Sequence, residues 1–130
     1  MSPFAAKEGD RVVAVDTHVV LVASTPPVLV PGPYPFNGLI DGNLSSDVTI
    51  EGRPAATLGS AATNTPPHIP VGGTFVKPPS NRGTIITGSA TVRIGGRPAA
   101  RAGDTAMTCN DPVDLPVGSV VATGTVSIGG

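Results

Sequence analysis

The sequence of 130 residues is poor in aromatic side chains and in charge. Only 3% of its residues are aromatic, and it contains no tryptophan. A hydrophobic core must therefore be built mainly from Val, Ile, Leu and Ala side chains. Charged residues make up 13% of the chain, and the net charge is −1. Because nucleic-acid binding depends on many basic residues that neutralise phosphates, this balance argues against a nucleic-acid partner.

Cysteine and long apolar runs are also scarce. The single cysteine, Cys109, excludes an intramolecular disulfide and leaves a buried thiol, a reactive thiol or a metal ligand. No apolar run approaches the ~20 residues of a membrane span. The first residues lack the basic-then-apolar order of a signal peptide. We therefore expect the protein to be made in the cytoplasm, and either kept there or exported by a route that needs no such peptide.

Glycine and proline, by contrast, are abundant, with 17 and 15 copies. Helix interiors do not tolerate so many prolines, and apolar residues alternate with period two in several places. A disordered chain of this glycine and proline content would carry more charge and fewer β-branched residues. The composition predicts an ordered, turn-rich, all-β fold without substantial helix, formed as a single domain over residues 1–130.

One phrase occurs three times. A Val-x-Ile-x-Gly run lies at residues 48–52, 92–96 and 126–130, and Arg-Pro-Ala-Ala follows the first two runs. Such repetition predicts a pseudo-threefold cone of short β-hairpins, with these runs in the returning strands. We expect two hairpins over residues 83–94 and 118–128. In the first copy, residues 19–22 would pair with residues 48–50 around an irregular, proline-rich insertion at about 24–47.

Three residues with metal-binding side chains precede the three expected hairpins: His18, His68 and Cys109. A pseudo-threefold axis would relate these side chains and let them converge. Imidazole and thiolate are common zinc ligands, and a structural zinc ion would add its binding free energy to folding. Each residue alone also fits a plainer interpretation, as a surface histidine, a turn residue or a buried thiol. A fourth ligand would be Asp111 or Asp114, a water molecule or another residue.

Enzymatic chemistry has little support in the sequence. There is no Gly-x-Ser-x-Gly motif, and Gly95-Gly96 does not open a phosphate-binding pattern. Asp10 and Asp104 each follow a glycine, and we expect their carboxylates to accept hydrogen bonds from nearby backbone amides. We therefore predict no catalytic residue and no organic cofactor. A small metal-dependent hydrolase with an open coordination position remains as an alternative.

Residues 97–104, Arg-Pro-Ala-Ala-Arg-Ala-Gly-Asp, followed by Cys109, resemble the PAAR-repeat proteins. Members of this family are tip proteins of contractile injection machines, including type VI secretion systems and extracellular phage-tail-like particles. Gly9-Asp10 with His18, and residues 53–56 with His68, are similar to further units of the family. The resemblance covers roughly residues 7–130, and the insertion at 24–47 fits it least.

The resemblance implies a small cone seated on a trimeric spike, with zinc near its apex held by three histidines and one cysteine. His18, His68 and Cys109 match this set, whereas a third histidine is absent. The second unit also departs from the pattern, with Thr57 for the closing Arg and Ser60 for Asp. The expected function is a non-enzymatic spike tip that aids membrane puncture, touches the target membrane transiently and leaves the cytoplasm within the injection particle. The alternative is an adaptor that recruits a separate toxin or effector through the insertion.

Overall fold

Three antiparallel hairpins form a closed ring of six strands in the computed structural model, which describes residues 3–129. The hairpins pair β1 (Arg11–Val22) with β2 (Val28–Gly42), β5 (Ala61–Asn64) with β7 (Arg82–Ile85), and β10 (Thr105–Thr108) with β11 (Leu115–Val121). Neighbouring hairpins pair with one another, and β11 closes the ring by pairing with β1. The short strand β6 (Thr74–Phe75) pairs with the outer half of β1.

The described residues contain no helix, so the prediction of an all-β fold is confirmed. It follows that no helix within residues 3–129 has the length and apolar character needed to cross a membrane.

Two very short hairpins lie at one end of the ring. In the first, β3 (Thr49–Ile50) pairs with β4 (Arg53–Pro54), and in the second, β8 (Arg93–Ile94) pairs with β9 (Arg97–Pro98). Both turn on two residues with positive φ, 52° and 80° at residues 51–52 and 59° and 81° at residues 95–96. This is the type I′ turn of two-residue hairpins. The repeated phrase thus forms a hairpin by itself.

The third copy of this hairpin is assembled from the two ends of the chain. Ser127 pairs with Phe4, and the Ile128 amide donates to the Pro3 carbonyl at 2.8 Å. Phe4 therefore occupies the place that Pro54 and Pro98 occupy in the other copies. The alanines that follow in all three copies are buried together.

A ring of backbone hydrogen bonds joins the three copies around a common axis. The Ala6 amide donates to Ala100, the Ala100 amide to Ala56 and the Ala56 amide to Ala6, at 3.0, 3.1 and 3.0 Å. All three alanines are fully buried. Because the three backbones converge and protein interiors are close-packed, we expect this layer to favour a small side chain such as alanine. The predicted pseudo-threefold symmetry is confirmed.

The predicted hairpin partners, however, are wrong. Residues 19–22 pair with residues 28–31 and not with residues 48–50. Hairpins over 83–94 and 118–128 do not form, since β7 pairs with β5 and β10, and β8 pairs with β9. Alternation of apolar residues indicates that a segment is a strand, but it does not indicate which strand pairs with it. The tight two-residue turns make each repeated run pair with the residues that follow it, in a local hairpin.

The expected irregular insertion at about 24–47 is also corrected. Residues 28–42 form β2, which has 15 residues and is the longest of the described strands. Its prolines at 31, 33 and 35 alternate along the strand. They are tolerated because β2 is an edge strand over these residues, where the missing amide hydrogens cost no ladder hydrogen bond.

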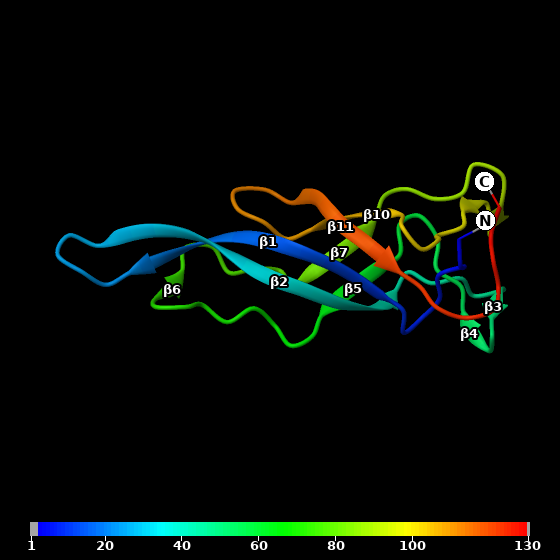
Figure 1. Cartoon of the computed structure of the whole chain (residues 1–130), viewed down its shortest axis with the longest axis horizontal. Helices are drawn as coiled ribbons and strands as arrows, with labels where there is room; N and C mark the ends of the chain where they lie inside the picture. The colour runs from blue at the N-terminus through cyan, green and yellow to red at the C-terminus, as the bar shows by residue number, and fades with distance from the viewer. Residues whose placement is uncertain (1–2, 130) are drawn as a thin grey trace.

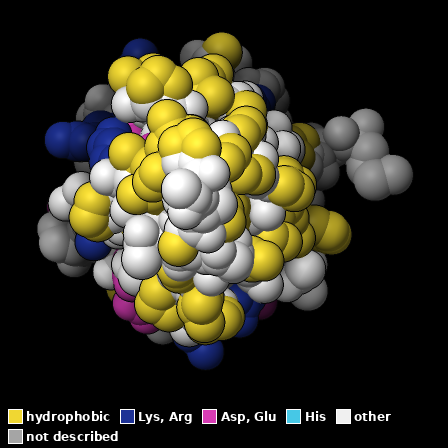
Figure 2. Space-filling model, turned by 90° about the vertical axis from the view of Figure 1, so that its left-hand side faces the viewer, with side chains coloured by type: hydrophobic (Ala, Val, Ile, Leu, Met, Phe, Trp, Pro, Cys, Tyr) yellow, Lys and Arg dark blue, Asp and Glu magenta, His cyan; other side chains and the backbone are white. Residues whose placement is uncertain are grey.

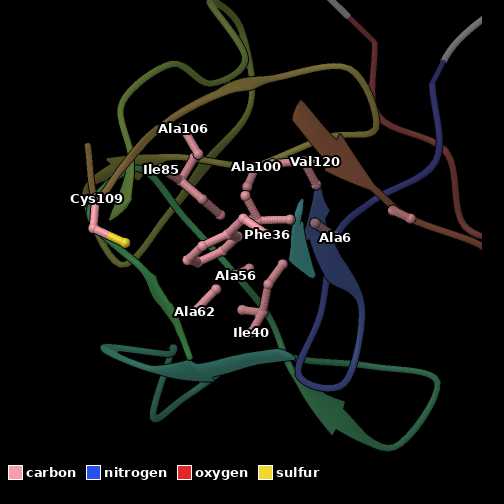
Figure 3. Packing of buried hydrophobic residues seen from close by; sticks show 12 residues of the cluster. Ala6, Phe36, Ile40, Ala56, Ala62, Ile85, Ala100, Ala106, Cys109 and Val120 are labelled. Atoms are coloured by element: carbon pink, nitrogen blue, oxygen red, sulfur yellow. The ribbon is translucent and has the colours of Figure 1, made fainter. Parts of the chain in front are cut away.

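The core lies inside the ring and is built around one large side chain. Figure 3 shows Phe36 in the middle of the cluster, with Ile40, Ile85 and Val120 around it. The rest of the cluster is mostly alanine. The phenyl ring of Phe36 lies against Gly38, where a Cβ would be 2.6 Å from one of its carbons. Glycine at position 38 therefore makes room for one aromatic side chain inside the small ring of strands.

The molecule is elongated, and its two ends differ. Figure 1 shows both termini and the short strands β3 and β4 at one end, while the β1–β2 hairpin projects at the other. We call the first end, which carries the three copies of the repeated hairpin, the base, and the second end the tip. The base is pseudo-threefold, whereas the tip carries one long hairpin and two loops of unequal length.

Candidate metal centre

Two inward-facing residues of β1 begin the candidate site. Asp16 and His18 are two residues apart, so they lie on the same face of the strand, and both are buried. This position is beyond the core, toward the tip. The buried alternation of β1 continues from Val12 to Val20, with a carboxylate and an imidazole in the middle of an otherwise apolar row.

His68 enters from the loop between β5 and β7. Its backbone amide donates to the Asn81 side chain at 2.8 Å, and its Nδ1 lies 3.2 Å from the Asn64 Nδ2. Because Asn64 also donates to Asn81, the imidazole is fixed from two sides. The Nε2 atom is left to point at Asp16.

Cys109 follows β10 directly, at the start of the loop that leads to β11. This loop is bound to the edge of β1. The Thr17 amide donates to the Asn110 side chain at 2.6 Å, and the Asp111 amide donates back to the Thr17 carbonyl at 2.8 Å. The docking brings Cys109 to the same side of β1 as His18.

The structure thus gathers the three predicted ligands, and it adds a fourth residue. One ligand atom each from Asp16, His18, His68 and Cys109 lies within 4.8 Å of the other three. Asp16 Oδ2 is 2.8 Å from His68 Nε2 and 3.4 Å from Cys109 Sγ. Its other oxygen accepts hydrogen bonds from Thr108 and Asn110. Asp16 was not among the predicted ligands, although its spacing of two residues from His18 on a strand was the signal that could have indicated it.

His18 is the residue whose bonding is incomplete. Neither of its ring nitrogens has a hydrogen-bond partner, although the side chain is buried. A buried polar group without a partner is unfavourable. The carboxylate of Asp111 is 3.6 Å from Nδ1, and its Oδ1 is also without a partner. His18 can therefore turn Nδ1–H toward Asp111 and keep Nε2 free for a ligand, as histidines at metal sites commonly do.

Cys109 is held as a thiol in the absence of a cation. Burial, followed by the negative charge of Asp16, raises the pKa of the Cys109 thiol to about 11. A metal ion would reverse this preference because it binds the thiolate. Two imidazoles, a thiolate and a carboxylate form a donor set that zinc accepts, so these residues fit the ion.

The surroundings of the cluster are aromatic on one side and open on another. The His18 ring centroid lies 5.8 Å from that of Tyr34 and 5.7 Å from that of Phe75, and the two imidazole centroids are 5.1 Å apart. A hollow of about 60 Å³ lies on the other side. It is lined by His18, Cys109 and residues 77–80, 110–111 and 114.

The two other candidates for a fourth ligand lie outside the four-residue cluster. Asp111 faces His18 and accepts a hydrogen bond from the Val19 amide at 2.8 Å. Asp114 contributes only to the lining of the hollow. Asp16 takes the fourth place because β1 presents its carboxylate inward beside His18.

The prediction for Asp10 and Asp104 is confirmed. The Lys7 amide donates to Asp10 at 3.1 Å, and the Arg101 amide donates to Asp104 at 2.6 Å. Ser60 makes the equivalent bond in the second copy, to the Thr57 amide at 2.9 Å. These residues therefore close a turn in each copy.

The comparisons with known proteins give one match. The family model for the PAAR motif matches residues 76–130. The match includes Cys109 and the second Arg-Pro-Ala-Ala run, and it is consistent with the family resemblance seen in the sequence. A comparison with curated proteins finds no match.

Proposed function

Residues 76–130 of this chain carry the PAAR motif, and on that premise we propose that the chain is the tip of a contractile injection system. Its base would cap the end of a trimeric spike, and its tip would lead into the target membrane. Type VI secretion systems and extracellular phage-tail-like particles are the machines that use such tips. The role is mechanical and needs no catalytic residue.

The observation that carries this proposal is the symmetry of the base. Three copies of one short hairpin surround an axis, and their alanines form a closed ring of hydrogen bonds. Ile50, Ile94 and Ile128 lie at equivalent positions and pack with alanines into a second apolar cluster. A single chain with this symmetry can present the same surface to each subunit of a trimer.

Edge strands at the base supply a means of attachment. Strands β3 and β8 each pair with one neighbour, β4 and β9, so β3 and β8 keep an outer edge. The carbonyls of Pro54 and Pro98, on β4 and β9, already accept from Glu8 and Leu58. Exposed strand edges pair readily with strands of another chain. Val48 and Val126, at equivalent positions in two copies, are 37% and 40% exposed and would be covered by such a partner.

We further propose that Asp16, His18, His68 and Cys109 hold a structural zinc ion. The unpartnered nitrogens of buried His18 support this assignment. The ion would supply a cross-link between β1 and the two loops that meet there. Asp16 would stand where the family has a third histidine. Because the core has one aromatic side chain, a few aliphatic ones and otherwise mostly alanine, such a cross-link would contribute much of the rigidity near the tip.

Co-assembly with the trimeric spike protein of the same injection system tests the capping role. We expect wild-type protein to bind the spike trimer at one copy per trimer in analytical size-exclusion chromatography. Val48→Asp and Val126→Asp should weaken this complex strongly, since a charge would be buried at the interface. Val15→Asp, at a 63% exposed position on the side of the molecule, is the matched control. Equal binding by all four proteins would contradict the proposal.

Elemental analysis of the purified protein tests the metal site. We expect about one zinc ion per chain, with large losses in His18→Ala, Cys109→Ala and Asp16→Ala. Asp114→Asn is the control, because Asp114 lines the hollow but is outside the cluster. Absence of stoichiometric metal from wild-type protein would overturn the site while leaving the capping role open.

The adaptor alternative depended on an irregular loop at about residues 24–47. Phe36 and Ile40 of the expected insertion are buried in the core, and residues 28–42 are paired strand. That segment is therefore not a free loop for recruiting a toxin. Its outer residues are exposed, so an effector that used them would bind a paired hairpin and not a loop.

A further inference from the structure

The two oxygens of the Asp16 carboxylate have different surroundings. Oδ1 accepts hydrogen bonds from the Thr108 hydroxyl at 2.5 Å and from the Asn110 Nδ2 at 3.4 Å. Oδ2 lies 2.8 Å from His68 Nε2 and 3.4 Å from Cys109 Sγ. One oxygen is therefore held by hydrogen-bond donors, while the other faces the remaining members of the cluster.

The Thr108 hydroxyl is the stronger of the two donors to Oδ1. Its distance lies in the short range that hydroxyl–carboxylate hydrogen bonds adopt, whereas the contact with Asn110 is longer than a usual N–H···O bond. Asp16 and Thr108 are both fully buried. Figure 2 looks onto the tip, and no histidine side chain of the described residues shows at its surface. Because the centre lies beneath this surface, protein donors must replace water around the carboxylate.

Two glycines set the direction of the Thr108 hydroxyl. Gly83 lies opposite Thr108 on β7, and Gly118 belongs to β11. An added Cβ would lie 3.4 Å from the Thr108 Cγ2 at Gly83 and 3.0 Å from it at Gly118. The methyl group thus fills the space beside the two glycines. Since a β-branched side chain has few χ1 rotamers, this packing leaves the hydroxyl pointing at Asp16.

A carboxylate needs such a contact more than an imidazole does at the same place. A carboxylate has two equivalent oxygens and can offer either or both of them to a cation. Carboxylates that bind metals are commonly held in turn by hydrogen bonds, and these outer contacts tune the affinity for the ion. Asp16 stands where the family has a third histidine, so the contacts that orient it are particular to this chain.

We propose that Thr108 is a positioning residue of the metal centre, whose hydroxyl holds Asp16 Oδ1 so that Oδ2 alone is presented to the ion. This inference rests on the proposed zinc site and assigns a role to a residue outside its four ligands. Thr108 directly precedes Cys109, so two adjacent residues orient one ligand and supply another.

Zinc affinity, measured by competition with a chromogenic chelator, tests this role. Thr108→Val replaces the hydroxyl with a methyl group of similar size, and we expect it to weaken zinc binding by about 10- to 100-fold, the usual effect of losing an outer contact. Thr108→Ser keeps the hydroxyl and should bind as wild type does. Thr63→Val is the matched control, because the Thr63 hydroxyl donates to the Asp41 carboxylate at 3.2 Å in an exposed contact.

Cobalt(II) in place of zinc gives a second measurement, because its visible spectrum reports the coordination geometry. We expect Thr108→Val to change the d–d bands and to keep the thiolate-to-cobalt band of Cys109. Urea unfolding of the metal-free proteins measures stability separately. A merely structural role would lower the free energy of unfolding in Thr108→Val and leave the cobalt spectrum and the zinc affinity unchanged.

A second pair of variants covers the case in which Thr108→Val does not fold. Thr108→Ala and Thr108→Ser both lack the methyl group and differ only in the hydroxyl. We expect Thr108→Ala to bind zinc more weakly than Thr108→Ser by the same factor of about 10 to 100. Equal affinities in this pair would overturn the proposal.

Failure of this inference can be told apart from failure of the zinc site. If wild-type protein binds neither zinc nor cobalt, the site is wrong and the role of Thr108 is wrong with it. If wild-type protein binds the ion and Thr108→Val binds it equally well, the site stands and only the positioning role is wrong. An equal loss of affinity in Thr63→Val would also contradict the role, since the effect would then not depend on Asp16.

Discussion

At the scale of single residues, the Asp16 carboxylate sets the chemistry of its buried neighbours. It accepts from Thr108, faces His68 and lies 3.4 Å from the Cys109 sulfur. Burial of the thiol, followed by the charge of Asp16, raises the pKa of Cys109 to about 11 without a metal. The carboxylate therefore adds to the effect of burial in keeping the thiol protonated, and it would become a ligand if the site were filled.

We expect alkylation of Cys109 by iodoacetamide in metal-free protein to be slow at pH 8 and to accelerate as the pH rises toward 11. Only the thiolate reacts, so Asp16→Asn should lower the pKa of Cys109 and speed the reaction several-fold at pH 9. Asp114→Asn should behave as wild type. The rates are measured by mass spectrometry, and equal rates in the two variants would contradict the role assigned to Asp16.

Glu51 makes a second residue-scale contact, between the first hairpin of the base and the third. Its carboxylate accepts from the Thr125 amide at 2.6 Å and from the Thr125 hydroxyl at 3.1 Å. These bonds lower the pKa of Glu51 below 4.5. Because the folded form has the lower pKa, the stabilisation is complete above pH 4.5 and is lost as the pH falls through the folded value.

Glu51→Gln should therefore remove part of the acid sensitivity of the fold. We expect the variant to lose less stability than wild type between pH 5 and pH 3, as measured by urea unfolding at each pH. Glu8→Gln serves as the control because it retains Glu51 and its bonds. Identical pH dependence in Glu51→Gln and wild type would show that the contact with Thr125 contributes nothing.

At the scale of elements, the hairpin at the tip is supported by β6. This strand pairs with Val20 and Leu21, and it approaches so closely that a Cβ at Gly73 would collide with the Leu21 carbonyl oxygen and lie 2.8 Å from a Val20 side-chain carbon. Backbone contact of this kind cannot be relieved by moving a side chain. The glycine is thus a condition for the pairing of β6 with β1.

Gly73→Ala should therefore detach β6 and lower the free energy of unfolding by about 1–3 kcal/mol, the range typical of overpacking. Gly32→Ala is the matched control, because its Cβ would make an ordinary contact of 3.7 Å with Tyr34. Urea unfolding gives the stability, and hydrogen exchange at Thr74 and Phe75 gives the local effect. Unchanged exchange in Gly73→Ala would contradict this account.

At the scale of the whole molecule, the pseudo-threefold axis depends on three small side chains. Ala6, Ala56 and Ala100 are fully buried, and their backbones bond to one another in a ring. We expect a larger side chain at any of the three positions to overpack the axis. A change in one copy should consequently disturb all three copies.

We expect Ala56→Val to destabilise the fold by about 1–3 kcal/mol through overpacking and to weaken spike binding as well, since the base loses its symmetry. Ala23→Val, at an exposed position near the tip, should change neither property. Thermal unfolding and co-assembly measure the two effects. A stable Ala56→Val variant with normal spike binding would show that the alanine ring does not organise the base.

The sequence by itself determined the features that are local. The repetition of one short run gave the number of copies. The turns at Gly52 and Gly96, where φ is positive, were not predicted, because the runs were assigned to returning strands. The turn roles of Asp10 and Asp104 could also be predicted, because each carboxylate accepts from a backbone amide only three residues away in the sequence. The spacing of His18, His68 and Cys109 before successive units indicated that these residues would converge, and the structure brings them together.

Only the tertiary structure decided which segments pair. Strand alternation is the same for every partner, so β1 could not be assigned to β2, and residues 28–42 could not be distinguished from a proline-rich loop. The third hairpin joins Phe4 to Ser127, a contact between opposite ends of the sequence. Asp16 lies within the candidate metal centre only because two distant loops fold against β1. Such contacts depend on packing in three dimensions, which a periodic pattern along the chain does not specify.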